Sequence, residues 1–277
     1  MHDDGLFGSL LGKSVDYAVG YDPRTLFAVE RAPLRVAWAV ADVRTFIGAD
    51  IWNAYELSWL NTRGKPHVAL ARIVFDAHTP YLIESKSLKL YLYGYSESRF
   101  NSVDEVAAQI TADLTRVAGG LVSVHVQTAE HVEGQRLAEL PGLLLDRLDI
   151  DCEAAMPETG WLQTECNADP VEQTLVTRLF KSNCPVTGQP DWASVQIAYE
   201  GAPINEAGLL RYLLSFRHRQ AFHEQCVEAI FMDILRACQP MRLSVYARYT
   251  RRGGLDINPW RTNFTASLPE NVRHMRQ

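Results

Sequence analysis

Two stretches of the 277-residue chain decide its fold: ESKSLKLYLYGYSESRF at residues 84–100 and NEAGLLRYLLSFRHRQAF at residues 205–222. With a shift of 121 residues they match at three large apolar positions: Tyr91 with Tyr212, Leu92 with Leu213 and Tyr95 with Phe216. An internal repeat of this kind indicates two copies of one structural module. The alternative is two unrelated α+β stretches that look alike.

The alignment continues into a helix and a strand. After a slip of one residue, SVDEVAAQITADL of the first copy lies over EQCVEAIFMDIL of the second. Ser102 followed by Glu105 predicts a capping box at the start of the first helix, and Gly119-Gly120 predicts its end. The strands LVSV and RLSV close the two copies.

Strand patterns also precede the matched helices, so the order β-β-α-α-β occurs twice. The first-half segments are a strand at 54–60, a strand at 68–75 and a helical or mixed segment at 82–95; the second-half strands are TLVTRLF and SVQIAYEG. We therefore predict an α+β protein with one domain at 1–130 and another at 166–277. Residues 131–165 would connect them, because the segment 130–160 carries eight acidic residues against two arginines.

Composition excludes several classes of protein. Charged residues make up 22% of the chain and hydrophobic residues 47%, which is a globular mix. The net charge of −6 argues against a broad nucleic-acid or anionic-membrane surface. No apolar run nears the roughly 20 residues that span a membrane, and the first residues do not look like a secretory signal. The five cysteines lack a disulfide spacing, so we expect a cytoplasmic protein.

The second copy carries the candidate nucleophile. Cys184 stands in the loop KSNCPVTGQPDW, where a thiol can be exposed and activated, although a buried structural cysteine is the simpler interpretation. Asp191 could move a proton if Trp192 excludes water from it, or could be a turn residue. His223 and Glu224 open a helix and could converge on the thiol, or simply suit a first helical turn.

The first copy carries candidate binding residues. Glu84 could accept two parallel N–H donors, as the edge of a guanine ring requires. Lys86, Lys89, Arg251 and Arg252 could hold a phosphorylated cofactor, and Gly253-Gly254 would let the backbone approach it. Alternating lysines on an exposed sheet edge are the other interpretation. No Rossmann or P-loop glycine motif occurs in the chain.

One set of residues has the chemistry of a metal site. Cys184, His223 and Cys226 would form a Cys-His-Cys set of the kind that binds zinc, but their spacing is nonspecific and no paired C-x-x-C occurs. We predict no metal. A second hypothesis for Cys226 is a disulfide with Cys184 that protects the thiol, and the alternative is a packed helical cysteine. Cys152, Cys166 and Cys238 are interpreted as structural or incidental.

Four motifs in this order resemble one enzyme family: ESKSLKLY, SNCPVTGQPDWASVQI, SFRHRQAFHEQC and YTRRGGLDINPW. The chain is similar to the NADPH-dependent 7-cyano-7-deazaguanine reductases, the nitrile reductases of queuosine biosynthesis, in their long two-repeat form. The resemblance implies the tunnelling fold, with two tandem repeats of antiparallel sheet and helices on one face, and a homodimer. It also implies a four-electron reduction of a deazapurine nitrile to 7-aminomethyl-7-deazaguanine through a covalent thioimide.

The resemblance implies roles for individual residues. The catalytic residues would be the nucleophile Cys184, the proton donor Asp191 and His223. Substrate would be bound by Ile83, Glu84, Ser85, His223 and Glu224. NADPH would be contacted by Ser85, Lys86, Arg252 and Gly253. No direct contact with nucleic acid or membrane is expected, since the product is a precursor base in tRNA modification. The alternatives are a zinc-dependent pterin or GTP cyclohydrolase-like enzyme of the same fold and a non-catalytic purine-binding module.

Overall fold

The computed structural model describes residues 20–40, 42–128, 137–152, 158–165 and 167–277. They form two compact units, each built from segments that are distant in sequence. The first holds the described residues of Met1–Ala37, Asp50–Gln135 and Arg251–Ile257, and the second those of Trp38–Ala49, Arg136–Thr250 and Asn258–Gln277. Strands β2 (Ile47–Leu60) and β10 (Leu255–Thr262) contribute residues to both units. The domain boundaries at residues 130 and 166 stay a prediction.

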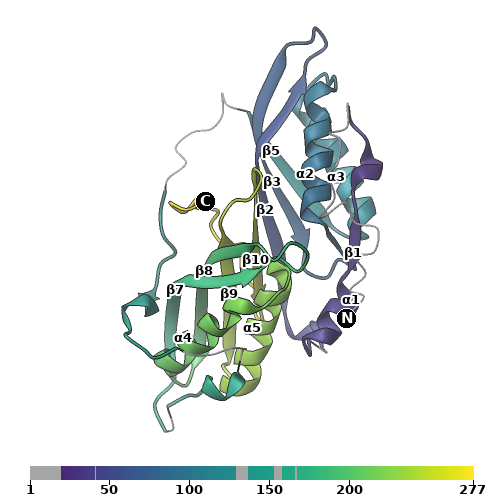
Figure 1. Cartoon of the computed structure of the whole chain (residues 1–277). Coiled ribbons are helices and arrows are strands. Elements are labelled where there is room, and N and C mark those ends of the chain that lie inside the picture. The colour runs from purple at the N-terminus through teal and green to yellow at the C-terminus, as the bar shows by residue number, and fades with distance from the viewer. Residues whose placement is uncertain (1–19, 41, 129–136, 153–157, 166) are drawn as a thin grey trace. The chain divides into compact units, whose positions relative to one another are not determined.

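The first unit packs α2 and α3 against one face of its strands, as Figure 1 shows. Its strand order is β5-β3-β2-β10, and β1 pairs with β4 in a small separate sheet. Its other elements are β1 (Ala28–Glu30), α1 (Arg31–Ala37), β3 (Pro66–Asp76), β4 (Tyr81–Ile83), α2 (Ser85–Tyr93), α3 (Val103–Ala118) and β5 (Val122–Thr128). The segment 82–95, predicted as helical or mixed, therefore resolves into the end of a strand and a helix.

The second unit has the strand order β10-β9-β8-β7-β6 with α4 and α5 packed on its strands (Figure 1). Its elements are β6 (Leu143–Leu144), β7 (Val171–Asn183), β8 (Pro190–Gly201), α4 (Glu206–Leu214), α5 (His223–Cys238) and β9 (Arg242–Tyr249). The strands from β7 to β10 pair antiparallel, whereas the short β6 pairs parallel with β7. The predicted α+β class is confirmed, and β6 is the exception to the predicted antiparallel sheet because it belongs to the connector and not to the repeat.

The described part of the predicted connector packs against β7. The Asp146 carboxylate accepts hydrogen bonds from the Thr177 hydroxyl at 2.7 Å and from the Arg178 N–H at 3.2 Å. Arg147 forms an ion pair with Glu206 at the start of α4. These polar contacts, together with the fully buried Leu145, hold the acidic segment on the second unit. Residues 131–136 and 153–157 of the connector lie outside the described residues, and so does Cys166.

The internal repeat is confirmed by the lengths and spacing of the helices. Helices α2 and α4 both have nine residues, and their first residues, 85 and 206, differ by the predicted 121. Helices α3 and α5 both have 16 residues, and their first residues, 103 and 223, differ by 120. The slip of one residue therefore has the opposite sense to the predicted alignment, which starts with Ser102 over Glu224. The order β-β-α-α-β therefore occurs twice, with the short β4 added in the first copy.

A buried tyrosine–aspartate pair repeats with the helices. In the first unit the Tyr91 hydroxyl donates to Asp113 at 2.8 Å, and in the second the Tyr212 hydroxyl donates to Asp233 at 2.6 Å. Burial raises the pKa of both tyrosines, so both stay protonated donors at neutral pH. The same pair in both copies ties the two helices of each module together and is independent support for a duplication.

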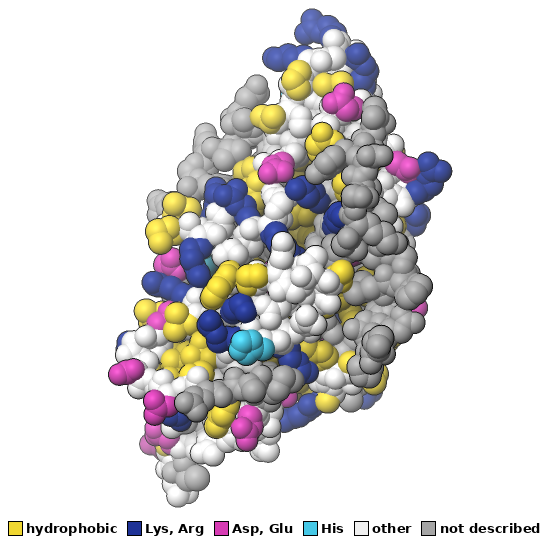
Figure 2. Space-filling view, in the orientation of Figure 1, with side chains coloured by type: hydrophobic (Ala, Val, Ile, Leu, Met, Phe, Trp, Pro, Cys, Tyr) yellow, Lys and Arg dark blue, Asp and Glu magenta, His cyan; other side chains and the backbone are white. Residues whose placement is uncertain are grey.

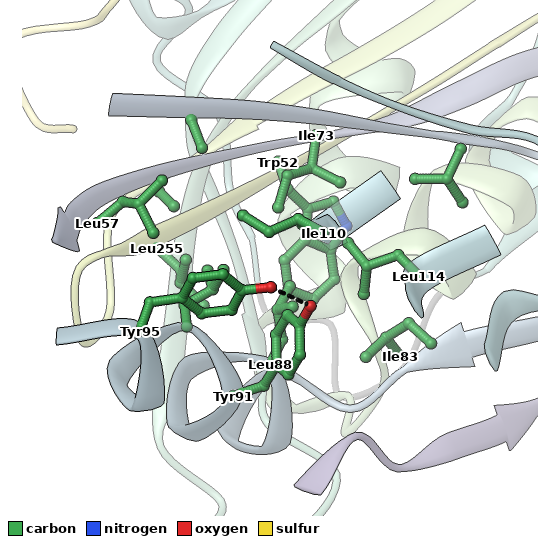
Figure 3. Close-up of a cluster of buried hydrophobic side chains, with 14 of the residues drawn as sticks. Trp52, Leu57, Ile73, Ile83, Leu88, Tyr91, Tyr95, Ile110, Leu114 and Leu255 are labelled. Atoms are coloured by element: carbon green, nitrogen blue, oxygen red, sulfur yellow. Dashed lines mark hydrogen bonds between the residues drawn. The ribbon is translucent and has the colours of Figure 1, made fainter. Parts of the chain in front are cut away.

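The core of the first unit lies between its helices and strands, and Figure 3 shows part of it. Apolar side chains from α2, α3 and β2 meet there, among them Leu88, Ile110, Leu114 and Trp52, each at most 2% exposed. Each such side chain stabilises the fold by about 2 kcal/mol through removal from water. The Tyr91 and Tyr95 hydroxyls share a hydrogen bond of 2.7 Å inside this core, drawn as a dashed line in Figure 3.

The predicted helix at residues 102–118 begins as expected, but only half of its capping box forms. The Ser102 side chain accepts from the Glu105 N–H at 3.1 Å, and Gly119 ends the helix with a φ of 70°. The Glu105 carboxylate, however, accepts from the N–H of Asn101 at 2.7 Å and not from that of Ser102. The prediction was wrong here because the long glutamate side chain can reach one residue beyond the cap.

Candidate active site

The hairpin between β7 and β8 places Cys184 and Asp191 at the same end of the second unit. Ser182 lies opposite Asp191 in the register, and the Cys184 N–H donates to the Gln189 carbonyl at 2.8 Å. The Gly188 N–H donates back to the Cys184 carbonyl at 3.0 Å, and Gly188 adopts a φ of 69° that suits glycine. The predicted loop is therefore a tight turn whose geometry fixes the backbone of Cys184 relative to the start of β8.

Cys184 and Asp191 are both withdrawn from water, at 4% and 6% exposure. Trp192 does not cause this burial. Successive side chains of a strand point to opposite faces, and Trp192 is 37% exposed beneath the guanidinium of Arg217. The prediction that Trp192 shields Asp191 was wrong, because the strand period turns the two neighbours away from each other.

The segment before α5 is tied to the end of β7, which brings His223 to the hairpin. The Asn183 N–H donates to the Arg219 carbonyl at 2.8 Å, and the Ala221 N–H donates to the Asn183 carbonyl at 3.0 Å. Helix α5 starts two residues later, and His223 Nε2 lies 3.4 Å from Asp191 Oδ2. The structure thus brings Asp191 and His223 together. The convergence of His223 and Glu224 on the Cys184 thiol stays a prediction.

Beneath His223 lies Tyr249, the last residue of β9. The two rings stack with centroids 3.7 Å apart and planes within 5° of parallel, and Tyr249 is fully buried. No role is predicted for Tyr249 from the sequence, although it begins the motif YTRRGGLDINPW. Its place at the end of an alternating strand predicts burial but not the partner that it stacks on. This stacking holds the plane of the imidazole while the ring edge faces Asp191.

Cys226 is the other cysteine near this group, on the first turns of α5. It is fully buried, and burial raises the pKa of its thiol to about 12 despite the favourable hydroxyls of Ser182 and Tyr249. Cys226 therefore stays a protonated thiol at neutral pH and is a poor nucleophile. Cys184 and Cys226 are both free thiols in the structure. Their disulfide stays a hypothesis.

The predicted base-binding residues of the first unit begin α2. Ile83 and Glu84 are buried, at 4% and 1% exposure. The Glu84 carboxylate caps the helix: it accepts from the N–H of Lys86 at 2.7 Å and from that of Ser87 at 2.8 Å. Two parallel N–H donors thus meet Glu84, as its chemistry suggested, but here they belong to its own helix. In the second copy Asn205 is the matching cap, which accepts from Gly208.

A pocket of about 230 Å³ lies in the first unit beside the other predicted cofactor residues. It is formed by β2, by α2 with the turn after it, and by the glycine turn before β10; its members include Glu56, Leu57, Lys89, Tyr93 and Gly253. Gly253 and Gly254 have φ values of 62° and 78°. Other residues rarely adopt these positive φ values, so the turn suits glycine, and the Gly253 backbone passes close to the flexible end of Lys89.

The predicted site residues therefore form two groups, one in each unit. Cys184, Asp191, His223 and the 4%-exposed Glu224 belong to the second unit. The ESK segment and the turn with Arg252 and Gly253 belong to the first. Across the part of the chain that the structure describes, no cluster of three His, Cys, Asp or Glu residues is arranged to hold a metal ion. None of the described helices has the length and apolarity to span a membrane.

Comparison with known proteins gives one consistent result. A family model described as "Nitrile reductase, 7-cyano-7-deazaguanine-reductase N-term" matches residues 17–126, and one described as "QueF-like protein" matches residues 190–267. The chain is 52% identical over 269 residues to the NADPH-dependent 7-cyano-7-deazaguanine reductase of Burkholderia vietnamiensis, covering 97% of this chain and 98% of that protein. The enzyme of the same name from Cupriavidus necator is 52% identical over 271 residues, with the same coverage.

Among solved structures, the apo form of an archaeosine synthase QueF-Like is similar to part of the chain. The match has a TM-score of 0.31 and 16% identity, and it covers 36% of this chain and 99% of that one.

Proposed function

Because the chain belongs to the family of NADPH-dependent 7-cyano-7-deazaguanine reductases, we propose that it reduces the nitrile of 7-cyano-7-deazaguanine with NADPH in queuosine biosynthesis. The observation that carries the proposal is the close approach of Asp191 and His223 at the buried end of the Cys184 hairpin. Covalent catalysis needs a nucleophile, a proton source and a group that orients the proton source. Cys184, Asp191 and His223 would fill these three roles. The zinc-dependent and non-catalytic alternatives lack such a supporting observation.

The chemistry follows from the electronic character of a nitrile. Its carbon is a weak electrophile, so Cys184 adds to it as a thiolate while Asp191 gives a proton to the nitrile nitrogen. One C–S bond and one N–H bond form, and the product is a neutral thioimide on Cys184. NADPH supplies, in two equivalents, the hydrides that turn this carbon into the CH₂ of the aminomethyl product. Release of the Cys184 thiolate after the first reduction restores the nucleophile.

Burial of the catalytic group serves the same chemistry. Cys184 and Asp191 are at most 6% exposed, and the His223 side chain is 13% exposed. An imine left in water would hydrolyse, so a dry site protects the half-reduced substrate. In such a site His223 orients the Asp191 carboxyl through the 3.4 Å contact of its Nε2 with Asp191 Oδ2.

The base would be read by Ile83, Glu84, Ser85, His223 and Glu224. Each oxygen of the Glu84 carboxylate accepts one backbone N–H and has a second acceptor position. The cap therefore orients the carboxylate rigidly without using all of its acceptor capacity. This supports a role for Glu84 in recognising the N–H edge of a deazaguanine.

The residues around the glycine turn fit a phosphorylated dinucleotide. Figure 2 shows basic and acidic side chains mixed over one face of the molecule. Lys89 lines the pocket, and exposed Arg251 and Arg252 flank it. The apolar wall formed by Leu57 and Tyr93 suits a flat heterocycle. Ser85, Lys86, Arg252 and Gly253 would complete the contacts with NADPH.

Lys89→Ala should weaken NADPH binding about tenfold, because a charged hydrogen bond to phosphate contributes about 1.5 kcal/mol or more. The effect should shrink at high salt. Binding is measured by fluorescence titration without the nitrile, so the result does not depend on turnover. Lys65→Ala, which removes an exposed charge of the same unit outside the pocket, should leave the dissociation constant unchanged. Equal affinities for Lys89→Ala and the parent protein would remove Lys89 from the cofactor site.

The family resemblance also supports a homodimer that works in the cytoplasm. The thiol chemistry agrees with a reducing compartment, since Cys152, Cys184, Cys226 and Cys238 are all free. We propose no direct contact with nucleic acid, because the substrate is a free base.

The activity itself is tested by adding 7-cyano-7-deazaguanine to the protein with NADPH. We expect the NADPH absorbance to fall by two equivalents per base, with the aminomethyl product identified by mass spectrometry. A protein that binds the base without consuming NADPH would be a binding module, and one that needs added zinc would belong with the cyclohydrolases. Either result would contradict the proposal.

A further inference from the structure

Gln277, in the segment 271–277, is 3% exposed and contacts Tyr249, the residue that stacks on His223. Its Oε1 accepts from Arg248 Nε at 3.0 Å and from the His274 N–H at 3.1 Å. Its Nε2 donates to the Tyr249 carbonyl at 2.8 Å and to Asn258 Oδ1 at 2.9 Å. All the hydrogen-bonding capacity of this amide is used, which is typical of a side chain that fixes its surroundings.

Tyr249 is held at its backbone by these side chains. Its N–H donates to Asn258 Oδ1 at 3.2 Å, and its carbonyl accepts from Gln277. The same Asn258 oxygen accepts from Gln277, so Tyr249, Asn258 and Gln277 form a buried network in which each residue bonds the other two. The backbone register between β9 and β10 covers Ser244–Tyr246 and Trp260–Thr262, nearer the other end of β9. On the β10 side of β9, Asn258 and Gln277 therefore bind the Tyr249 backbone in place of a strand, while on the other side Tyr249 pairs with Ala193 of β8.

The other side of Tyr249 faces the chemistry. Its ring stacks on His223, and His223 Nε2 lies 3.4 Å from Asp191. A shift of the Tyr249 backbone would therefore move the imidazole relative to the carboxyl that delivers the proton. A displacement of about 1 Å in such a group can lower a rate roughly 100-fold.

From this chain of contacts we propose that Gln277 is a positioning residue, which acts through Tyr249 to hold His223 against Asp191. The proposal rests on the proposed function, because it assigns the residues behind that same site. It gives a catalytic reason for the burial of Gln277, which lies beyond the family motifs. Arg248 shares in it, because its guanidinium also holds Asn271 at 2.9 Å.

The test compares Gln277→Glu with the parent enzyme. Glutamate keeps the acceptor for Arg248 and His274 but loses both donors of Nε2, to the Tyr249 carbonyl and to Asn258 Oδ1. The attraction between the new carboxylate and the Arg248 guanidinium should keep the segment docked while its hold on Tyr249 is lost. We expect kcat to fall about 10- to 100-fold with KM for the nitrile nearly unchanged. The rate of adduct formation on Cys184 should fall in parallel. Met275→Ala, at a 77%-exposed neighbour, is the matched control and should behave as the parent protein.

Tyr249 provides a second, independent arm. Tyr249→Leu removes the stacking surface and should lower kcat as Gln277→Glu does, whereas Tyr249→Phe keeps the ring and should restore most of the rate. The double variant Gln277→Glu with Tyr249→Leu should be no slower than Tyr249→Leu alone, because both act through His223. A kcat for Gln277→Glu equal to that of Met275→Ala, or losses that multiply in the double variant, would overturn the proposal. Failure of the parent enzyme to consume NADPH would instead contradict the proposed function.

Discussion

Cys184→Ala should abolish nitrile reduction, with a loss of at least about 10³-fold, because no other described thiol can replace it as the nucleophile. Cys226 is the near alternative, but burial raises the pKa of its thiol to about 12, and it stays protonated at neutral pH. The measurement is mass spectrometry of the intact protein mixed with 7-cyano-7-deazaguanine in the absence of NADPH. The parent protein should gain the mass of one base, and the variant should gain none.

The control for the cysteine experiment is Cys152→Ala. Cys152 is exposed and lies outside the site, so its removal should leave the adduct and the turnover as they are. Since Cys184 is buried, the fold of Cys184→Ala is checked by its melting temperature and by its affinity for NADPH. A base covalently attached to Cys184→Ala would show that another residue is the nucleophile.

Asp191→Asn should slow adduct formation about 10²- to 10⁴-fold, because an amide of the same shape cannot give a proton to the nitrile nitrogen. Thiolate addition without protonation leaves a strongly basic nitrogen anion in a site where Asp191 is only 6% exposed. The addition would therefore reverse faster than the thioimide accumulates. The rate is followed by stopped-flow absorbance of the base or by quenched mass spectrometry.

Two comparisons separate proton donation from general damage to the site. Asp146→Asn changes an aspartate of the same unit that bonds Thr177 outside the site, and it should leave the rate unchanged. Alkylation of Cys184 by iodoacetamide should continue in Asp191→Asn, because the thiol is still present. An adduct that forms as fast in Asp191→Asn as in the parent protein would remove Asp191 from the role of proton donor.

Much of the fold could be predicted because local sequence patterns repeat in the two copies. The helical period of apolar residues depends on neighbours within four positions, so the sequence predicts the copies at 85–93 and 206–214 with the right spacing. The elements that the patterns missed are short. Strand β1 has three residues and β6 has two, and their pairing comes from partners elsewhere in the chain.

The candidate site divides in the same way. The turn motif around Cys184 predicts a hairpin, and a hairpin register places Cys184 near Asp191 whatever the rest of the fold does. The role of Glu84 was open, because a carboxylate before a helix can cap it or bind a base. The structure shows that it caps α2, and its part in recognising the base stays a prediction.

The sequence by itself therefore determined the duplicated α+β architecture and the hairpin that carries the nucleophile, because both depend on patterns among residues close together in the chain. It also determined the family, because four motifs occur in the family's order. Only the tertiary structure decided what stands behind the site. Tyr249 is 26 residues from His223 and Gln277 is a further 28 from Tyr249, yet the three are joined by a ring stack and a hydrogen bond. No period in the sequence relates them. Tyr249 reaches the site because β9 pairs antiparallel with β8, the strand that carries Asp191. Gln277 reaches Tyr249 because segment 271–277 docks on β9 through the hydrogen bond between Gln277 and Arg248.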